Sequence, residues 1–339
     1  MTRQERLQII KEIEEERGSK LISYIAGDRR GLETRIASDI FPLFFKHLSQ
    51  IGHQDSIDLF LYSTGGITIA GYGLVNLIRE FCDKLTVFVP FKAYSCATLI
   101  ALGANDIIMT KMGQLGPIDP SVNHPLSPTV PIPGQPGAVM NVPVNVEDVV
   151  GYMDLGKTQA DLKNEESRVK AFEQLSSRVN PIVLGAVYRA REQIAFLAKT
   201  LLSYHMTEEE KIDFIVNTLT KERFSHDYLI GRKEAKDVFK LNVIDVSEAL
   251  DKNIVKLYDN YNELLSLETP YSPEVFLKTV EAQTGNFNRG IIESIDLTHV
   301  YRTTKDVRRI QINQQGMPMP VVAFQERVLS DGWLIDNNI

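Results

Sequence analysis

The most constraining feature of this sequence is an alternation of apolar runs and helical patterns between residues 56 and 111. Apolar runs of strand length occupy residues 56–62, 85–90 and 106–111, and helical periodicity fills the two intervals between them. Strands that alternate with helices through short links predict a parallel sheet flanked by helices, and therefore an α/β fold. Such sheets place their functional residues at the carboxyl ends of the strands.

The segments around this centre extend the prediction in both directions. Upstream, the patterns predict a helix over residues 4–17, a first strand over 21–25 and a helix over 33–51. Eight of the 15 prolines lie between Pro117 and Pro143, which predicts an exposed loop. Downstream, residues 146–220 read as helices interrupted at Pro181, and 251–265 as another helix. From about residue 286 the pattern changes and predicts a C-terminal β-hairpin.

Composition and charge restrict the function classes. The chain has 339 residues, 43% of them hydrophobic and 24% charged, which is typical of a globular protein with a large core. A formal net charge of -7 and a pI near 5.5 argue against nucleic acid as a partner. The six histidines show no metal-ligand spacing, and no phosphate-binding or dinucleotide-binding glycine motif is present. The sequence therefore implies no metal and no cofactor.

Cysteine usage and apolar run length indicate the compartment. The two cysteines, Cys82 and Cys96, form no CxxC pair, which is typical of a reducing environment. The N-terminal 20 residues are too charged for a signal peptide. The longest apolar runs are about half as long as a membrane helix requires. We therefore expect a cytoplasmic protein with no membrane span of its own.

Two features at the carboxyl ends of the predicted strands could carry chemistry. Ser95 opens the helix after the second strand, where backbone N–H groups are free and a developing alkoxide is stabilised. Serine is also a favoured helix N-cap, so its position alone fits a structural role equally well. Gly65 and Gly66 follow the first strand, and their N–H groups could polarise a carbonyl. A pair of glycines alone is also typical of a simple turn.

Taken in order, these pieces resemble the Clp-protease/crotonase superfamily. The sequence runs from YSTGG (62–66) to AYSCAT (93–98) and then to LGPIDP (115–120). Within the superfamily it is most similar to the serine dehydrogenase proteinase branch, which is related to signal peptide peptidase A. Further similarities lie at VNPIVLGAVYRA (179–190) and SHDYLIGRKEA (225–235). The resemblance covers about residues 55–260 and implies a serine peptidase.

The resemblance assigns roles to four residues. Ser95 would be the nucleophile that is acylated by the substrate. The backbone amides of Gly66 and Cys96 would form the oxyanion hole, and Gly65 would let the chain turn into that geometry. The substrate would be a protein or peptide, and the fold would form a homo-oligomer.

The resemblance and the patterns outside it together predict a division of the chain. Residues 1–20 would form an N-terminal helix, and residues 21–265 a Clp/crotonase-like domain that includes the Pro-rich loop 117–143. Residues 266–339 would form a C-terminal extension, whose hairpin could add an edge strand to another subunit.

The general base is where this chain departs from the Clp pattern. At the place where Clp proteases carry a histidine, this chain has Asp119, within a turn. One substitute is His226, with Asp227 beside it as an orienting acid. The other substitutes are Lys157 and Lys163, by similarity to the serine–lysine pair of signal peptide peptidase A. A lysine base would have to be desolvated to become neutral.

Two further functions remain open at this point. The missing histidine leaves room for a catalytically inactive scaffold of the same fold that binds partner proteins. A crotonase-like enzyme that acts on coenzyme A thioesters needs no serine nucleophile, so Ser95 within YSCAT argues against it.

Overall fold

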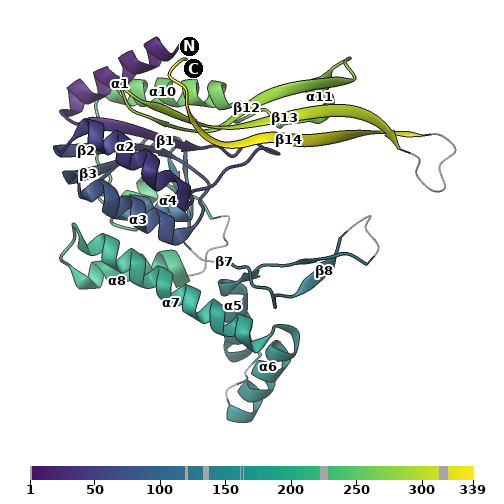
Figure 1. Cartoon of the computed structure of the whole chain (residues 1–339). Coiled ribbons are helices and arrows are strands. Elements are labelled where there is room, and N and C mark those ends of the chain that lie inside the picture. Colours follow the sequence, from purple (N-terminus) through teal and green to yellow (C-terminus); the bar gives the residue numbers. More distant parts are fainter. Residues whose placement is uncertain are drawn as a thin grey trace. The chain divides into compact units, whose positions relative to one another are not determined.

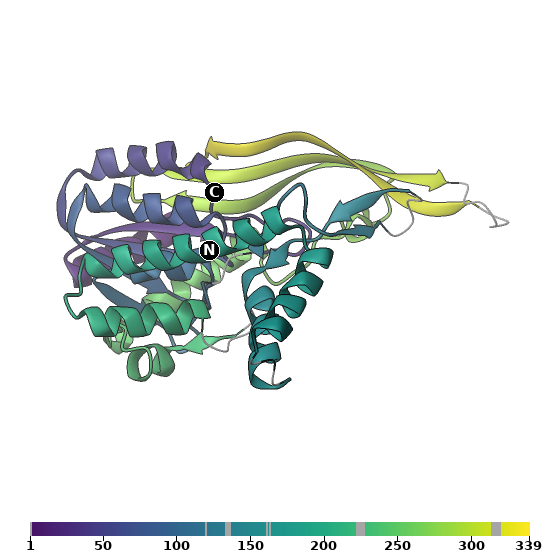
Figure 2. The same ribbon diagram turned by 90° about the horizontal axis from the view of Figure 1, so that it is seen from below.

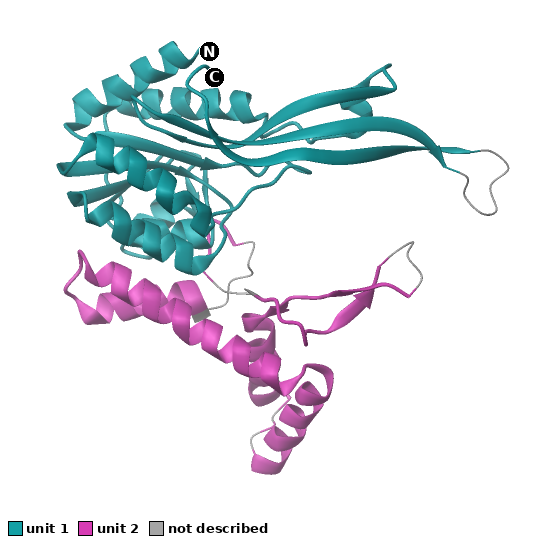
Figure 3. Cartoon of the chain, in the orientation of Figure 1, with its two compact units in different colours: residues 1–115, 230–339 teal, residues 116–229 magenta. Residues whose placement is uncertain are grey.

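The computed structural model describes residues 2–118, 121–132, 137–160, 162, 164–221, 228–312 and 320–339. The chain divides into two compact units, shown in different colours in Figure 3. Unit 1 comprises residues 1–115 and 230–339, and unit 2 comprises residues 116–229.

Unit 1 is built on a seven-stranded sheet with the order β14-β13-β12-β1-β2-β3-β5. The strands are β1 (Lys20–Ala26), β2 (Gln54–Tyr62), β3 (Cys82–Val89), β5 (Asp106–Met109), β12 (Ala282–Glu293), β13 (Thr298–Ile312) and β14 (Val321–Ile335). Strands β1, β2, β3 and β5 pair in parallel, which confirms the α/β fold that the sequence predicts. Strand β12 joins β1 in antiparallel orientation, and β13 and β14 continue in the same way.

Helices cover both faces of the parallel half, as Figures 1 and 2 show. One face carries α1 (Arg3–Arg17) and α10 (Glu248–Leu265), and the other carries α2 (Phe41–Ile51), α3 (Thr68–Arg79) and α4 (Cys96–Leu102). The first pair packs on the sheet through buried residues that include Ile10, Phe60 and Leu257. On the second face the ring of Phe44 packs edge-on against Tyr24 at 5.5 Å. This double cover explains why the parallel strands are apolar along nearly their whole length.

Smaller elements complete unit 1. They are η1 (Ser38–Ile40), α9 (Arg232–Asp237), α11 (Pro273–Leu277) and a three-stranded sheet of β11 (Ile230–Gly231), β6 (Gln114–Leu115) and β4 (Lys92–Ala93). Helix α1 begins at Thr2 with a capping box, in which Thr2 and Glu5 bond each other's backbone N–H.

The second predicted helix is shorter than expected. The sequence predicts a helix over residues 33–51, but α2 begins only at Phe41, with a proline in its first turn. Residue Ile36 forms an isolated parallel β-bridge with Gly66 instead. The backbone at Ile36 is therefore not helical, because it pairs with the glycine turn after β2, and only the short η1 lies between it and α2.

The C-terminal region contains more sheet than the sequence predicts. The expected hairpin is present as β13 and β14, paired from His299↔Ile335 to Ile312↔Val321. Strand β12 is an additional strand, and it joins this hairpin to β1 at the centre of the sheet. The glycines and asparagines near its start hide its strand character in the sequence. In Figures 1 and 2 the three strands continue beyond the helix-covered half of unit 1.

Unit 2 is mainly helical. It comprises α5 (Val146–Thr158), α6 (Glu165–Arg178), α7 (Pro181–Ser203) and α8 (Glu209–Lys221), with short strands β7 (Ser121–Val122), β8 (Thr129–Pro131), β9 (Val139–Asn141) and β10 (Val144–Asn145). The predicted helical interruption at Pro181 is confirmed, because Asn180 caps α7 there. The Pro-rich stretch is not entirely irregular, since β8 and β9 form an exposed antiparallel hairpin.

None of the helices in the described part of the chain combines the length and apolarity needed to cross a membrane.

Candidate functional site

Ser95 occupies a strained position at the carboxyl edge of the sheet. It follows β4 and stands at the N-cap of α4 with φ 51° and ψ -114°. A positive φ costs a non-glycine residue of the order of 1–3 kcal/mol and is retained mainly at functional sites. The Ser95 side chain makes no capping hydrogen bond, and its Oγ has no partner among the described residues. Although Ser95 stands at the N-cap position, its side chain therefore does not cap the helix.

Gly65, the first of the two glycines, lies against this serine. Gly65 has φ 122°, and a Cβ placed on it would lie 3.0 Å from Ser95 Cβ and 3.4 Å from Ser95 Oγ. Gly65 is fixed by Ser63, whose Oγ accepts from the Gly65 N–H at 3.0 Å. The fold thus brings the YSTGG and YSCAT segments together, as the sequence predicts.

The N–H of Gly66 points away from the β-bridge that Gly66 forms with Ile36. Ile36 donates to the Gly65 carbonyl at 3.0 Å and accepts from the Ile67 N–H at 2.8 Å. In a parallel bridge of this kind the residue between those two, Gly66, turns its own N–H to the opposite side. Among the described residues, neither the Gly66 N–H nor the Cys96 N–H has a hydrogen-bond acceptor. Both N–H groups are thus free to bind an oxyanion.

The thiol of Cys96 is not a competing nucleophile. Its Sγ donates to the Ile67 carbonyl at 3.3 Å. Burial raises the pKa of Cys96 to about 12, so the thiol stays protonated at neutral pH. Cys96 can therefore contribute to the site only through its backbone.

A polar network holds the segment that leads into Ser95. Lys92 on β4 donates to Asp28 at 2.7 Å, and Tyr62 at the end of β2 donates to the other oxygen of Asp28 at 2.7 Å. Next to Ser95, Tyr94 donates to Gln114 on β6 at 2.5 Å. Since Lys92 is paired with a carboxylate, it has no role as a neutral base in this arrangement.

The candidate bases lie elsewhere in the chain. His226, Asp227 and Lys163 fall outside the described residues, as does Asp119. Lys157 lies on α5 of unit 2, where it is exposed to solvent. The described histidines of unit 1 are engaged in other contacts: His47 bonds Ser294 and His299, and His53 pairs with Asp83.

The described residues contain no group of three or more His, Cys, Asp and Glu side chains that could hold a metal ion.

Part of the chain that includes this edge of the sheet is similar to a known protein family. Residues 1–132 match the family of ClpP-like SDH-type serine proteinases. The ClpP-like segment includes Gly65, Gly66, Ser95 and Cys96, so all four residues of the candidate site lie within it.

Two relatives come from Methanocaldococcus jannaschii, and both are uncharacterised. MJ1495 is 31% identical over 127 residues, which are 35% of this chain and 43% of the relative. MJ0137 is 25% identical over 207 residues, which are 61% of this chain and 59% of the relative. The chain thus spans between two fifths and three fifths of the relatives' own lengths.

Among solved structures, this chain is similar to two variants of a 1510-N membrane-bound stomatin-specific protease. For a serine-to-alanine variant the TM-score is 0.38 and the identity 14%, covering 63% of this chain and 76% of that one. For a lysine-to-alanine variant in complex with a substrate peptide, the TM-score is 0.37 and the identity 15%, covering 63% and 72%.

The sequence predicts the central residues of the candidate site but not the contacts that hold them in place. Ser95 and the two glycines are recognisable because each stands at the end of a strand within a local motif. The pairing of Ile36 with Gly66 and the contact between Asp28 and Lys92 join residues 30 and 64 positions apart. These contacts depend on how the loop after β1 crosses the sheet edge, and no local sequence pattern predicts the course of that loop.

Proposed function

We propose that this protein is a serine peptidase that hydrolyses peptide bonds through an acyl-enzyme on Ser95. The observation that carries the proposal is the conformation of Ser95, which is strained, uncapped and in contact with Gly65. A serine with no structural hydrogen bond and a positive φ is well suited to present its Oγ to a substrate.

The reaction follows from this geometry. Ser95 Oγ attacks the carbonyl carbon of a peptide while a base takes the hydroxyl proton. The Gly66 and Cys96 N–H groups donate to the oxygen that becomes negative. The tetrahedral intermediate then collapses, the base returns its proton to the leaving amine, and water hydrolyses the acyl-enzyme.

We propose that the base comes from the segment between residues 116 and 229. His226, oriented by Asp227, is the first choice because imidazole titrates near neutral pH. Lys157 and Lys163 are the alternatives. We further propose that the chain works in a reducing compartment such as the cytoplasm, since Cys82 and Cys96 are both buried free thiols.

A second candidate is a catalytically inactive scaffold that binds proteins. One observation favours it: the position at which Clp proteases carry their histidine holds Asp119 in this chain.

Hydrolysis of fluorescein-labelled casein separates these two functions. We expect the wild type to be active and Ser95→Ala to lose activity by about a thousandfold or more. Ser38→Ala, which removes an exposed hydroxyl nearby, is the matched control and should keep full activity. His226→Gln, Lys157→Met and Lys163→Met then identify the base, because only one of them should match the loss in Ser95→Ala. A folded wild type with no activity above that of Ser95→Ala would favour the scaffold.

A further inference from the structure

The exposed β-hairpin of unit 2 is a sheet of only two strands, β8 and β9. Figure 1 shows this hairpin, labelled at β8, extending away from the helices of unit 2. A two-stranded hairpin is at best marginally stable in water, and three or more strands with an apolar face are needed for independent stability. The hairpin is therefore stabilised by any further strand that pairs with it.

The register gives this hairpin one wholly apolar face. Val130 of β8 pairs with Met140 of β9, and these two side chains are 42% and 52% exposed. Backbone hydrogen bonds of 2.7 and 3.0 Å continue the same register at both ends of the pairing. Because side chains alternate between the two faces of a strand, every second residue lies on the side of Val130 and Met140. That side carries Pro128, Val130, Ile132, Ala138, Met140 and Val142.

The outer edges of the hairpin follow from the same hydrogen bonds. The Val142 N–H donates to the Pro128 carbonyl, and the Ile132 N–H donates to the Ala138 carbonyl. In an antiparallel pair, bonded residues alternate with residues whose N–H and C=O groups point away from the partner strand. The outward groups therefore belong to Thr129 and Pro131 on β8 and to Val139 and Asn141 on β9.

The β9 edge is open to a further strand, whereas the β8 edge is not. Pro131 has no N–H, so β8 lacks one of its outward donors, and a proline on an edge strand discourages further pairing. Val139 and Asn141 keep both N–H and C=O on the β9 edge. None of these four backbone groups bonds another described residue. A strand that joins this hairpin therefore joins it at β9.

The segment that contains the hairpin is uncharged. Residues 120–146 contain no Asp, Glu, Lys or Arg, although 24% of the whole chain is charged. Two copies of a chain with a net charge of -7 repel each other over most of their surface. At the β9 edge this repulsion is smallest, because neither copy brings a charge to the contact. The charge distribution therefore favours a second copy of this chain as the partner.

We propose that the β9 edges of two copies pair in antiparallel orientation about a twofold axis at Met140. Val139 of each copy lies opposite Asn141 of the other, and their outward N–H and C=O groups exchange hydrogen bonds. The two hairpins become one four-stranded sheet with the order β8-β9-β9-β8. The axis is perpendicular to this sheet, so the apolar faces of both copies lie on the same side. The contact uses none of the residues of the proposed peptidase reaction and stands independently of it.

A disulfide at the axis tests this register. The two Met140 residues form a non-bonded antiparallel pair, whose Cα atoms lie about 4.5 Å apart, within the range that a disulfide spans. We therefore expect Met140→Cys to form a cross-linked dimer under mild oxidation, measured on the full chain by non-reducing electrophoresis. The native thiols Cys82 and Cys96 are buried and should not cross-link in the wild type.

Val130→Cys is the matched control for this cross-link. Val130 lies opposite Met140 on the same face, but on β8. Its two copies in the proposed sheet are three strand spacings apart, about 14 Å, which is too far for a disulfide. No cross-linked dimer with Met140→Cys, or equal cross-linking with Val130→Cys, would overturn the proposal.

Charges placed on the axis give a second test. Met140→Lys and Met140→Glu each set like charges opposite each other, so each variant alone should sediment more slowly than the wild type. An equimolar mixture sets opposite charges across the axis and should sediment faster than either variant alone. A mixture that sediments like the separate variants would contradict pairing at Met140.

Proline substitutions distinguish the two edges of the hairpin. Val139→Pro removes an outward N–H from β9, and Thr129→Pro removes one from β8, while both leave the hydrogen bonds between β8 and β9 in place. Val139→Pro deletes two hydrogen bonds from each dimer and should weaken self-association by about tenfold or more, whereas Thr129→Pro should leave it unchanged. Equal effects would contradict the choice of the β9 edge. Slower casein hydrolysis in Val139→Pro with unchanged self-association would show that the edge binds substrate instead, and would also overturn the proposal.

Discussion

The two halves of the seven-stranded sheet differ in how they are buried. Strands β1, β2 and β3 of the parallel half are buried along most of their length, because helices cover both faces. In the antiparallel half, β14 is exposed along much of its length, β13 becomes only partly buried after its first residues, and β14 pairs with β13 alone among the described strands. The proposed peptidase site lies at the carboxyl edge of the parallel half.

Because of this difference in burial, the two halves of the sheet are suited to different roles. The parallel half provides a rigid, fully packed frame that can hold Ser95 in a strained conformation. The antiparallel half has exposed surface and irregular register, with one bulge at Arg289 and another at Leu329. Such strands are suited to binding ligands and partners rather than to supporting a catalytic centre.

The largest expected effect concerns the junction of the two halves. Arg6 on α1 bonds Glu293 of β12 at 2.5 and 2.9 Å, and both side chains are almost completely buried. Arg6→Met should therefore lower the free energy of unfolding by about 3–5 kcal/mol, because the buried Glu293 loses its direct partner and keeps only the longer ion pair with Arg3 at 3.6 Å. The partly exposed pair Lys305–Glu326, which joins β13 and β14, is the control, and Lys305→Met should lower the free energy of unfolding by less than about 1 kcal/mol. Urea unfolding measures both variants. Equal losses of unfolding free energy would contradict the proposed difference between the junction and the β13–β14 pair.

A second large effect is expected at the proposed oxyanion turn. A Cβ on Gly66 would lie 2.2 Å from the Ile36 carbonyl oxygen, so Gly66→Ala must displace the bridge between the two segments. We expect a loss of about 3 kcal/mol in unfolding free energy together with loss of casein hydrolysis. Gly18→Ala, at φ 60° with open space around it, should cost only about 1 kcal/mol and leave hydrolysis intact. Normal hydrolysis in Gly66→Ala would show that this turn does not support the reaction.

A buried histidine pair should make the stability depend on pH where α2 meets the antiparallel half. His47 bonds His299 at 3.0 Å, burial lowers the pKa of His47 to about 3, and burial also lowers the pKa of His299. The unfolded chain binds protons below pH about 6.5 while the folded histidines do not, so stability falls as pH drops from 6.5 toward 3. His47 alone should account for about 1.4 kcal/mol of unfolding free energy between pH 7.5 and 5.5.

Urea unfolding at these two pH values checks this expectation. The difference between them should shrink by about that amount in His47→Gln and stay unchanged in the exposed His53→Gln. An equal difference in His47→Gln and in the wild type would show that His47 does not titrate on unfolding.

The smallest effect on stability is expected at the free edge of β14. Val328 and Leu329 are 54% and 51% exposed there, which is suited to pairing with a second copy of the chain. The double change Val328→Lys and Leu329→Lys should alter unfolding free energy by less than about 0.5 kcal/mol but lower the sedimentation coefficient. Val275→Lys, at an exposed site on α11, is the control and should sediment like the wild type. A monomeric wild type would remove the reason for the proposed pairing.

The sequence predicts the parallel half well because the signals that specify it are local. Runs such as SIDLFLY and LTVFVP are mostly apolar, and their alternation with helices determines the type of sheet. The antiparallel half is harder to predict. Strand β12 begins with AQTGN, and its place beside β1 depends on pairing between residues more than 260 positions apart. No local pattern carries that information.

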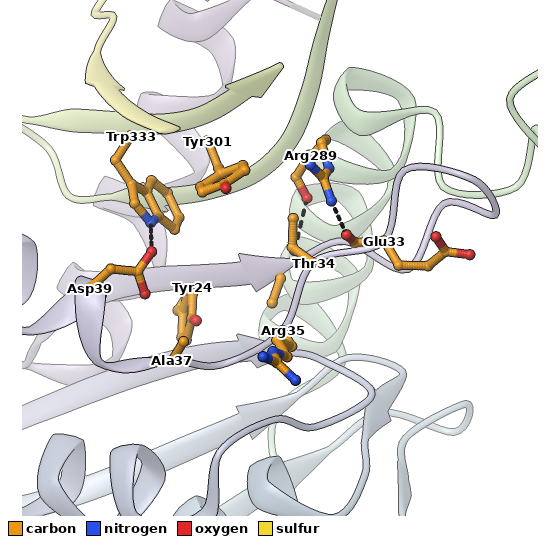
Figure 4. Close-up of a pocket in the computed structure, with 10 residues that line it drawn as sticks. Tyr24, Glu33, Thr34, Arg35, Ala37, Asp39, Arg289, Tyr301 and Trp333 are labelled. Atoms are coloured by element: carbon orange, nitrogen blue, oxygen red, sulfur yellow. Dashed lines mark hydrogen bonds between the residues drawn. The ribbon is translucent and has the colours of Figure 1, made fainter. Parts of the chain in front are cut away.

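The same reasoning applies to the candidate sites. Ser95, Gly65 and Gly66 are found from the sequence because each stands at a strand end within a recognisable motif. A cavity of about 330 Å³ in unit 1 is not found from the sequence (Figure 4), since Tyr24, Tyr301 and Trp333, which line it, meet only through the register of β1, β12, β13 and β14. The extended segment at Ile36 is misread as helix because tertiary pairing overrides its helical periodicity.

Covalent labelling of Ser95 tests the central claim most directly. The protein would be incubated with a fluorophosphonate, and the adduct measured by intact mass and located by peptide mapping. We expect one adduct per chain on Ser95, absent in Ser95→Ala and undiminished in Ser38→Ala. An adduct on a different residue, or none on a folded protein that the reagent can enter, would contradict the assignment of Ser95 as the nucleophile.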